Sequence, residues 1–193
     1  AASDVYKRQV DKIKRRLIYE RDKRSIFKTF KDKGGRLALN TKLSIQGTFS
    51  IGRNVVIQNE GIDNITRSQI VVLPGALLEI DDNVGMTQIS ITCKNYIHIG
   101  ANVKIGAGTM IYDTNFHNTD WQVRRNHEQD LLTAKNAPVV IEDDVFIGAR
   151  SIIGKGVTIG ARTIIAAGSV VVKGIPADCI AGGNPCQVIK QIL

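Results

Sequence analysis

The stretch that decides the fold runs from Ile141 to Pro176 and reads IEDDVF IGARSI IGKGVT IGARTI IAAGSV VVKGIP. Each six-residue unit begins with an aliphatic residue, and a smaller or β-branched residue follows four positions later. The aliphatic residues stand at positions 141, 147, 153, 159, 165 and 171, and the residues that follow include Val145, Ser151, Val157, Thr163 and Ser169. A single strand repeats every two residues and an α-helix about every 3.6, so a period of six indicates neither alone.

A period of six fits short strands that are separated by tight corners. One position before the smaller residue, many units carry Gly, Asn or Asp, which tolerate the left-handed backbone of a tight corner. These corner residues include Asn54, Asn102, Gly108, Asp144, Gly156 and Gly168. Three units make one triangular coil, and stacked coils bury each other's inward side chains in a shared core. The sequence therefore predicts an all-β parallel β-helix.

The repeat extends beyond this stretch, although it is blurred between residues 58 and 98. The same phase includes Ile99, Ile105 and Ile111, and also Ile45, Ile51 and Ile57. Without residues 117–140, which lack the repeat, the span from residue 45 to residue 176 holds 108 residues, or six coils of eighteen. We expect a basic N-terminal segment at 1–35 that contains a helix, a β-helix at 36–176 with an extruded loop at 117–140, and a C-terminal tail at 177–193.

Positive charge is concentrated at the N-terminus. The chain has 193 residues and a formal charge of +8, and residues 1–33 hold 12 Lys or Arg against 5 Asp or Glu. Apolar residues at helical spacing between 10 and 31 predict an amphipathic helix there: Val10, Ile13, Leu17, Ile26 and Phe30. Three roles are open for this helix. It caps the end of the β-helix, or it makes a peripheral membrane contact, or it binds nucleic acid, for which the sequence offers no recognition module.

Cysteine content and hydropathy favour a cytoplasmic protein. The three cysteines, Cys93, Cys179 and Cys186, give no disulfide framework and suit a reducing compartment. No apolar run approaches the roughly 18 residues of a membrane span. The N-terminus also has no apolar segment typical of a secretion signal.

The extruded loop, HNTDWQVRRNHEQDLLTAKNAPVV, begins directly after the Ile111 unit. A loop of this length is usually functional or disordered. It carries the only tryptophan, Trp121, the pair Arg124 and Arg125, and two of the three histidines. We therefore expect the loop to take part in function. Trp121 and the two arginines either contact the acceptor or the coenzyme of a neighbouring subunit, or they only anchor the loop and carry solvated charges.

Three motifs together resemble the hexapeptide-repeat acyltransferases, and in particular the sugar O-acetyltransferases of the galactoside, maltose and surface-polysaccharide type. The motifs are the six-residue repeat, the sequence DTNFH at 113–117, and the C-terminal sequences AAGSVVVKGIP at 166–176 and AGGNPCQVIK at 181–190. The resemblance implies a left-handed β-helix, whereas the general rule for parallel crossovers predicts the opposite hand. It further implies a homotrimer that binds acetyl-CoA as co-substrate between subunits and needs no metal.

The resemblance also makes His117 the general base. Acetyl transfer to a hydroxyl needs a group that removes the proton, and imidazole titrates near neutral pH. Asp113 and Asn115 orient this imidazole or hold the acceptor, or they are turn residues that close a corner. We expect His98 to face outward and His127 to be a solvated loop residue.

Alignment to the family assigns coenzyme contacts to six residues, which are Ala149, Ala167, Val172, Lys173, Gln187 and Lys190. Small side chains leave room for the pantetheine arm, and lysines meet phosphates as point charges. Gln187 replaces a residue that is often Arg in the family, so the phosphate contact expected here lacks the positive charge of an arginine. Phe146 stands where the family often has Trp.

The expected reaction is direct transfer of acetyl from acetyl-CoA to a hydroxyl of a sugar or surface-polysaccharide precursor. Three alternatives stay open: an N-acetyltransferase of an amino sugar or antibiotic, a γ-class carbonic anhydrase-like metal site, and a non-catalytic scaffold. The carbonic anhydrase needs three histidines around one metal. The spacing of His98, His117 and His127 does not match that family's pattern.

Overall fold

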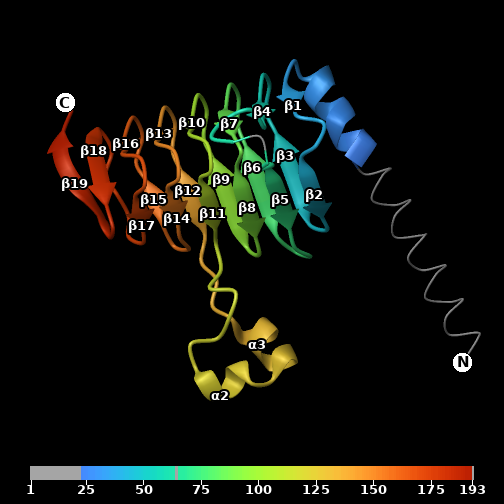
Figure 1. Cartoon of the computed structure of the whole chain (residues 1–193), viewed down its shortest axis with the longest axis vertical. Coiled ribbons are helices and arrows are strands. Elements are labelled where there is room, and N and C mark those ends of the chain that lie inside the picture. Colours follow the sequence, from blue (N-terminus) through green and yellow to red (C-terminus); the bar gives the residue numbers. More distant parts are fainter. Residues whose placement is uncertain (1–22, 64, 193) are drawn as a thin grey trace, which may run out of the picture.

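The computed structural model describes residues 23–63 and 65–192, and these residues form a parallel β-helix with three flat faces (Figure 1). Sheet A contains β1 (Arg36–Leu37), β4 (Val56–Gln58), β7 (Gly85–Thr87), β10 (Lys104–Ile105), β13 (Phe146–Ile147), β16 (Ile164–Ile165), β18 (Cys179–Gly183) and β19 (Cys186–Gln191). Sheet B contains β2 (Lys42–Ile45), β5 (Gln69–Val72), β8 (Ser90–Cys93), β11 (Met110–Tyr112), β14 (Ile152–Ile153) and β17 (Val170–Val171). Sheet C contains β3 (Thr48–Ile51), β6 (Leu77–Ile80), β9 (Tyr96–Ile99), β12 (Val139–Ile141) and β15 (Thr158–Ile159).

The chain passes through sheets A, B and C in that order, so β1, β2 and β3 make the first coil and β10, β11 and β12 the fourth. Sheet B has six strands, one from each coil, in agreement with the expected six coils. The sixth coil closes where Ile175 bridges Ile159. After it, β18 continues sheet A, and β19 turns back along β18 as the antiparallel strand.

The core consists of the aliphatic residues that define the repeat. Each stacks on the equivalent residue one coil away, because the parallel strands pair in register. One such row on sheet A is Ile57, Met86, Ile105, Ile147 and Ile165. All of these side chains are buried, and so are the smaller residues that follow the aliphatic positions, such as Val157 and Thr163. The predicted inward face is therefore confirmed.

The corners adopt the backbone that the sequence predicts. Asn54, Asn102 and Asp144 have φ between 56° and 60°, and the predicted corner glycines also have positive φ. At the corner between sheets C and A, asparagine side chains bond along the stack. The Nδ2 of Asn54 donates to the Oδ1 of Asn83 at 3.1 Å, and the Nδ2 of Asn83 donates to the Oδ1 of Asn102 at 3.2 Å. These bonds tie successive coils together.

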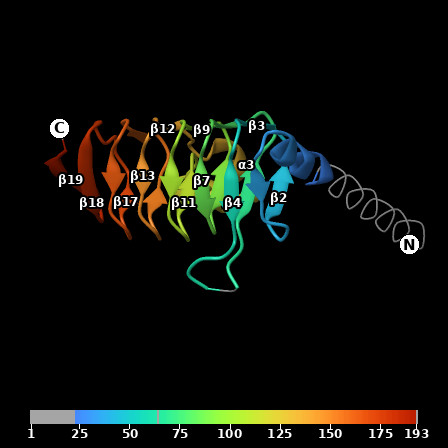
Figure 2. The ribbon, with the colours of Figure 1, turned by 90° about the horizontal axis from the view of Figure 1, so that it is seen from above.

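The repeat is blurred in the sequence because one corner is lengthened and the next is shortened. In the second coil, residues 59–63 and 65–68 lie in a loop between β4 and β5, called the β4–β5 loop, that leaves the body of the β-helix (Figure 2). In the third coil only Gln88 and Ile89 link β7 to β8. The larger excursion in the fourth coil occupies 113–138, because Val139 and Val140, which we expected in the loop, lie in β12.

At the N-terminal end, residues 23–32 form a helix that lies over the first coil (Figures 1 and 2). Phe30 is buried and its ring lies 6.5 Å from that of Phe49, between ring centroids. Ile26 and Phe27 also pack against the core. These contacts favour the capping role for this part of the helix, whereas Val10, Ile13 and Leu17 lie outside the described residues. Within the described ranges, no helix is long and apolar enough to cross a membrane.

Replacing one residue of an inward aliphatic row tests whether the stacked rows form the core. Ile159 is fully buried, while the neighbouring Thr158 is exposed on the outer face. Removing a buried Ile side chain to Cβ leaves a cavity and costs about 2–5 kcal/mol. We therefore expect Ile159→Ala to lower the free energy of unfolding in urea by that amount and Thr158→Ala to change it by less than about 0.5 kcal/mol. Equal losses in the two variants would contradict the assignment of inward and outward faces.

Candidate functional site

The excursion at 113–138, called the arm below, leaves the β-helix at the corner between sheets B and C (Figure 1). Its neck is held by backbone bonds, in which Asn115 donates to the Lys135 carbonyl at 2.9 Å and Ala137 donates to the Asp113 carbonyl at 2.9 Å. Two helices follow, α2 (Trp121–Arg124) and α3 (His127–Thr133). The Nζ of Lys94 donates to the Leu131 carbonyl at 2.7 Å and so ties α3 back to the third coil.

A histidine and an aspartate meet inside the arm. The Nδ1 of His117 lies 2.6 Å from the Oδ2 of Asp130, and the Oδ1 of Asp130 accepts from the Asn118 backbone N–H, also at 2.6 Å. The Asp130 side chain is 5% exposed and that of His117 is 65% exposed. The carboxylate is therefore a buried anchor, and the imidazole presents its free edge to solvent.

This pairing fixes how the imidazole can act. The hydrogen bonds from His117 and from the Asn118 N–H lower the pKa of Asp130 below its usual range, so its carboxylate is ionised near neutral pH. An ionised carboxylate only accepts hydrogen bonds, so Nδ1 of His117 carries the proton that it donates. In the neutral ring Nε2 is then the nitrogen with a free lone pair, which is the arrangement of an oriented general base.

Asp113 does not hydrogen-bond to the His117 imidazole, which is one of the roles expected for it. It is fully buried, and its carboxylate accepts from the backbone N–H groups of Lys94 at 2.8 Å and Asn95 at 2.7 Å. These bonds support the alternative in which Asp113 closes a corner. Asn115 is exposed on the neck, two residues before His117. The aspartate that orients His117 is Asp130.

The other prominent arm residues contact one another or the arm's own backbone. The guanidinium of Arg125 lies 4.4 Å from the centroid of the Trp121 ring, and this ring is 53% exposed. Arg124 donates through Nη1 to the Asn118 carbonyl at 2.8 Å. Arg124 thus anchors the turn that follows His117, whereas Trp121 and Arg125 form an exposed stacked pair.

The remaining two histidines are not part of the hydrogen-bonded pair of His117 and Asp130. His98 is on the outer face of sheet C, where its Nε2 lies 2.9 Å from the Oδ2 of Asp81. His127 is exposed at the start of α3. Among the described residues no group of three or more His, Cys, Asp or Glu is placed to hold a metal ion.

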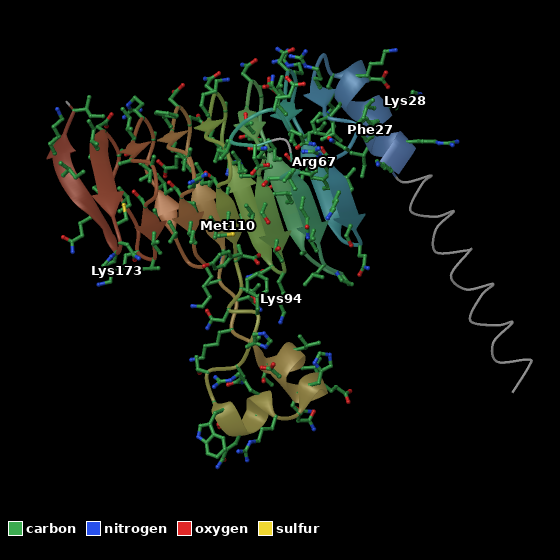
Figure 3. All side chains as sticks on the ribbon, viewed as in Figure 1. Phe27, Lys28, Arg67, Lys94, Met110 and Lys173 are labelled. Atoms are coloured by element: carbon green, nitrogen blue, oxygen red, sulfur yellow. The ribbon has the colours of Figure 1, made fainter. Side chains whose placement is uncertain are left out.

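The predicted coenzyme residues fall on three parts of the surface. Ala149 and Ala167 lie at the corner between sheets A and B, called the A/B corner, and Val172 and Lys173 lie at the corner between sheets B and C, called the B/C corner. Figure 3 shows Lys173 on the same edge of the β-helix as Lys94 and the arm. Gln187 and Lys190 are exposed on β19, where they pair with Gly182 and Ile180.

Close stacking at the A/B corner requires residues without side-chain bulk. A Cβ on Gly106 would lie 2.4 Å from the Ala149 N, and one on Gly148 would lie 2.4 Å from the Ala167 N. The second residue of this corner is Ala107, Ala149 and Ala167 in the fourth, fifth and sixth coils. The corner therefore presents a column of small residues that an extended ligand can approach closely.

In one copy of the chain, His117 and this alanine column stand at opposite edges of sheet B. The chain enters β11 from the A/B corner at Ala107 and leaves it for the arm at the B/C corner. The structure thus brings His117 together with Asp130, and Ala149 together with Ala167. It does not bring these two groups together within one copy.

Sequence reasoning missed Asp130. It lies 13 positions after His117, and that separation is set by α2 and α3 folding back on the neck rather than by the six-residue repeat. The signals available are weak: Asn126 is a good helix N-cap, and an aspartate four residues later then falls within the first turns of a short helix.

The repeat itself is shared with known transferases. Residues 138–173 match the family described as bacterial transferase hexapeptide (six repeats). The chain is 34% identical over 91 residues to a 2,3,4,5-tetrahydropyridine-2,6-dicarboxylate N-acetyltransferase of Staphylococcus aureus strain Newman. This match covers 47% of the chain and 31% of the relative, so the chain spans about a third of the length of the curated relatives it matches.

Solved structures show the same architecture. A hexapeptide-repeat acetyltransferase from Vibrio cholerae is 29% identical, with a TM-score of 0.52 over 79% of this chain and 72% of that one. A maltose O-acetyltransferase from Clostridium difficile is 24% identical, with a TM-score of 0.52 over 91% and 89% of the two chains, a likeness of fold. The chain therefore carries the hexapeptide repeat of bacterial transferases and has the parallel β-helix fold that the sequence predicts, with the left hand that the resemblance implies. The resemblance to hexapeptide-repeat acetyltransferases is confirmed.

The Asp130 carboxylate should make the fold of the arm pH-dependent. Because its pKa is lowered in the folded arm, its hydrogen bonds stabilise the arm above the pKa of an unfolded aspartate, about 3.9, and are lost as the pH falls through the lowered value. We expect hydrogen exchange to show the Asn118 amide losing protection below about pH 4. The Ala137 amide, bonded to a backbone carbonyl, serves as the reference.

Asp130→Asn should leave the Asn118 amide weakly protected already at neutral pH and remove its response to acid. If the Asn118 amide were equally protected, relative to Ala137, in the unmodified chain and in Asp130→Asn at neutral pH, the carboxylate would not be what holds this turn.

Proposed function

We propose that this chain is an acetyl-CoA-dependent acetyltransferase in which His117 is the general base. The observation that carries the proposal is the pair of His117 and Asp130, with Nδ1 held at 2.6 Å by a buried carboxylate and the ring exposed. A carboxylate that fixes one nitrogen of an exposed imidazole and leaves the other nitrogen free is the arrangement that a general base needs. The Vibrio cholerae acetyltransferase, at 29% identity, supports the same class of activity.

The reaction we propose is direct transfer. The acceptor oxygen attacks the carbonyl carbon of the thioester, and its proton moves to Nε2 of His117. The C–S bond then breaks, the new C–O bond remains, and the proton passes from Nε2 to the departing thiolate of coenzyme A. Backbone N–H groups would stabilise the oxyanion, as in other acyl transfers.

The cysteines favour this route over an acyl-enzyme intermediate. Cys93 is buried, and burial together with the nearby Asp113 raises the pKa of its thiol to about 12. Burial also raises the pKa of the Cys186 thiol. Because the thiolate is the nucleophilic form, neither side chain is prepared for attack on a thioester at neutral pH.

We propose a sugar hydroxyl as the acceptor, on the resemblance of the DTNFH motif at 113–117 to the sugar O-acetyltransferases. An amine acceptor is the second candidate, because the Staphylococcus aureus relative that is 34% identical is an N-acetyltransferase. A panel of sugars, polysaccharide fragments and amino sugars, with coenzyme A release as the readout, separates the two. Faster release with an amino sugar than with its hydroxyl analogue would favour the amine.

The coenzyme would lie along the A/B corner. Ala149 and Ala167 would let the pantetheine arm approach the backbone, and both keep some exposure. Lys190 is exposed on β19 and would meet phosphates, and Gln187 offers hydrogen bonds without charge. Lys173 lies at the B/C corner, so it would reach the coenzyme on a neighbouring copy rather than the one on its own A/B corner.

A second copy of the chain would complete the site. His117 stands at one edge of sheet B and the alanine column at the other, so a neighbouring copy would supply the base to each coenzyme. In a closed ring with rotational symmetry every copy gives one edge and receives the other. We propose that the ring is a homotrimer. We also propose that the protein acts in the cytoplasm, and that its basic N-terminal segment can add a peripheral membrane contact to the capping of the β-helix.

Substituting the base is the most direct test of the activity. If His117 takes the acceptor proton, His117→Ala should lower kcat by about 10²–10⁴-fold, the usual contribution of general base catalysis. Assembly size and affinity for coenzyme A should stay near those of the unmodified chain. Any dependence of kcat/KM on pH that comes from the general base should be absent from the variant.

His127→Ala is the matched control, because His127 shares the arm but points to solvent at the start of α3. It should keep kcat within about twofold, as a solvated residue that takes no part in proton transfer. A large loss in His127→Ala with activity retained in His117→Ala would contradict the assignment of the base. No turnover of acetyl-CoA by the unmodified chain with any acceptor would favour the scaffold instead.

A further inference from the structure

The β4–β5 loop lies on the surface but is held to the β-helix by several hydrogen bonds to one buried side chain. Its hub is Gln88, which is 2% exposed and sits in the shortened corner of the third coil. The Nε2 of Gln88 donates to the Asp63 carbonyl at 2.7 Å and to the Thr66 carbonyl at 3.2 Å. Its Oε1 accepts from the Ile62 N–H at 2.7 Å. One buried side chain thus fixes the path of the loop.

The fixed path carries the loop over the A/B corners of the two following coils. A Cβ on Gly61 would lie 2.9 Å from the Thr87 Cγ2 and 3.0 Å from the Ala107 Cβ. A Cβ on Gly108 would lie 3.2 Å from the Cδ1 of Ile62. The loop therefore fills the notch that the short third corner leaves, and Gly61 and Ile62 lie against Ala107 and Gly108 in the fourth coil.

This placement makes Ile62 the end of the alanine column. The column runs from Ala107 through Ala149 to Ala167, and toward the N-terminus it is closed by the loop. The Ile62 side chain is 40% exposed, so it offers an apolar surface to whatever lies in the column. The aliphatic part of Arg150 flanks the same position, with its Cγ at 3.5 Å from a Cβ on Gly108.

In the proposed function, the orientation of the coenzyme follows from the height along the β-helix axis, here called the level, at which the arm leaves the coils. The arm leaves the fourth coil, and Ala107 and Gly108 are the A/B corner of that same coil. When copies are related by rotation about an axis along the β-helix, equal levels of neighbouring copies face each other. The thioester must reach the partner's His117 at this level, so pantetheine extends along Ala149 and Ala167 and the acyl chain points toward Ile62.

We propose that Ile62, held in place by Gln88, limits the length of the acyl chain that the site accepts. The class of donor is then a short-chain acyl-CoA, with acetyl fitting in front of Ile62 and longer chains meeting its side chain. This inference rests on the proposed function and adds to it the residue that selects the donor. Gln88 acts through Ile62 and is a positioning residue.

Binding measurements test the proposal without knowledge of the acceptor. Calorimetric Kd values are measured for coenzyme A, acetyl-CoA, butyryl-CoA and hexanoyl-CoA with the full chain and three variants. For the unmodified chain, butyryl-CoA should bind at least about tenfold more weakly than acetyl-CoA, since misfitting methylenes in a pocket discriminate by about 10–200-fold. Ile62→Ala should reduce this ratio to within about threefold, and Ile62→Val should give an intermediate ratio.

Ile65→Ala is the matched control, because Ile65 belongs to the same loop and is 87% exposed. It should leave the ratio unchanged, and all variants should bind coenzyme A, which has no acyl chain, with the same Kd. An unchanged butyryl-to-acetyl ratio in Ile62→Ala, with acetyl-CoA still bound, would overturn the role of Ile62 alone. Failure of the unmodified chain to bind coenzyme A or acetyl-CoA at all would overturn the proposed function and this inference with it.

Discussion

The in-register stacking of parallel coils is the constraint on which everything else in this structure depends. Because each strand pairs with its equivalent one coil away, every corner position repeats as a column along the β-helix. A column of inward aliphatic residues gives the core, and a column of small residues at the A/B corner gives a surface that a long ligand can follow. The position of a side chain in one coil is thereby fixed relative to the equivalent residues of all the other coils.

The groups to which we assign function lie where the chain departs from this stacking. The arm leaves the fourth coil and places the His117 imidazole on a carboxylate that is itself held by a backbone N–H. The β4–β5 loop leaves the second coil and ends the small-residue column at Ile62. In the proposed site the regular coils are the scaffold and the two excursions carry the chemical groups, as functional residues in proteins often lie on loops that a rigid scaffold positions.

The sequence predicts the coils well because a six-residue pattern is local, and each unit meets the same surroundings. Residues such as Asn102 and Asp144 adopt positive φ as expected, and the aliphatic rows are buried. Asp130 and Gln88 could not be predicted in the same way. Their partners lie in chain segments that fold back on the β-helix and do not follow the six-residue repeat. Neither the sequence spacing nor the residue type therefore predicts these contacts. Asp113 shows the reverse case, since its place in a family motif suggests chemistry while its hydrogen bonds close a corner.

In the proposed assembly two copies build one site, with the base from one edge of sheet B and the coenzyme column from the other. Subunit mixing tests it most directly, using His117→Ala and Ala167→Trp, in which the bulky ring blocks the exposed column. Each variant alone should have little activity. After joint dissociation and reassembly at equal amounts, about a quarter of the sites should combine an intact His117 with an intact Ala167, and about a quarter of the full activity should return. Mixed assemblies that stay as inactive as the separate variants would show that each copy builds its own site.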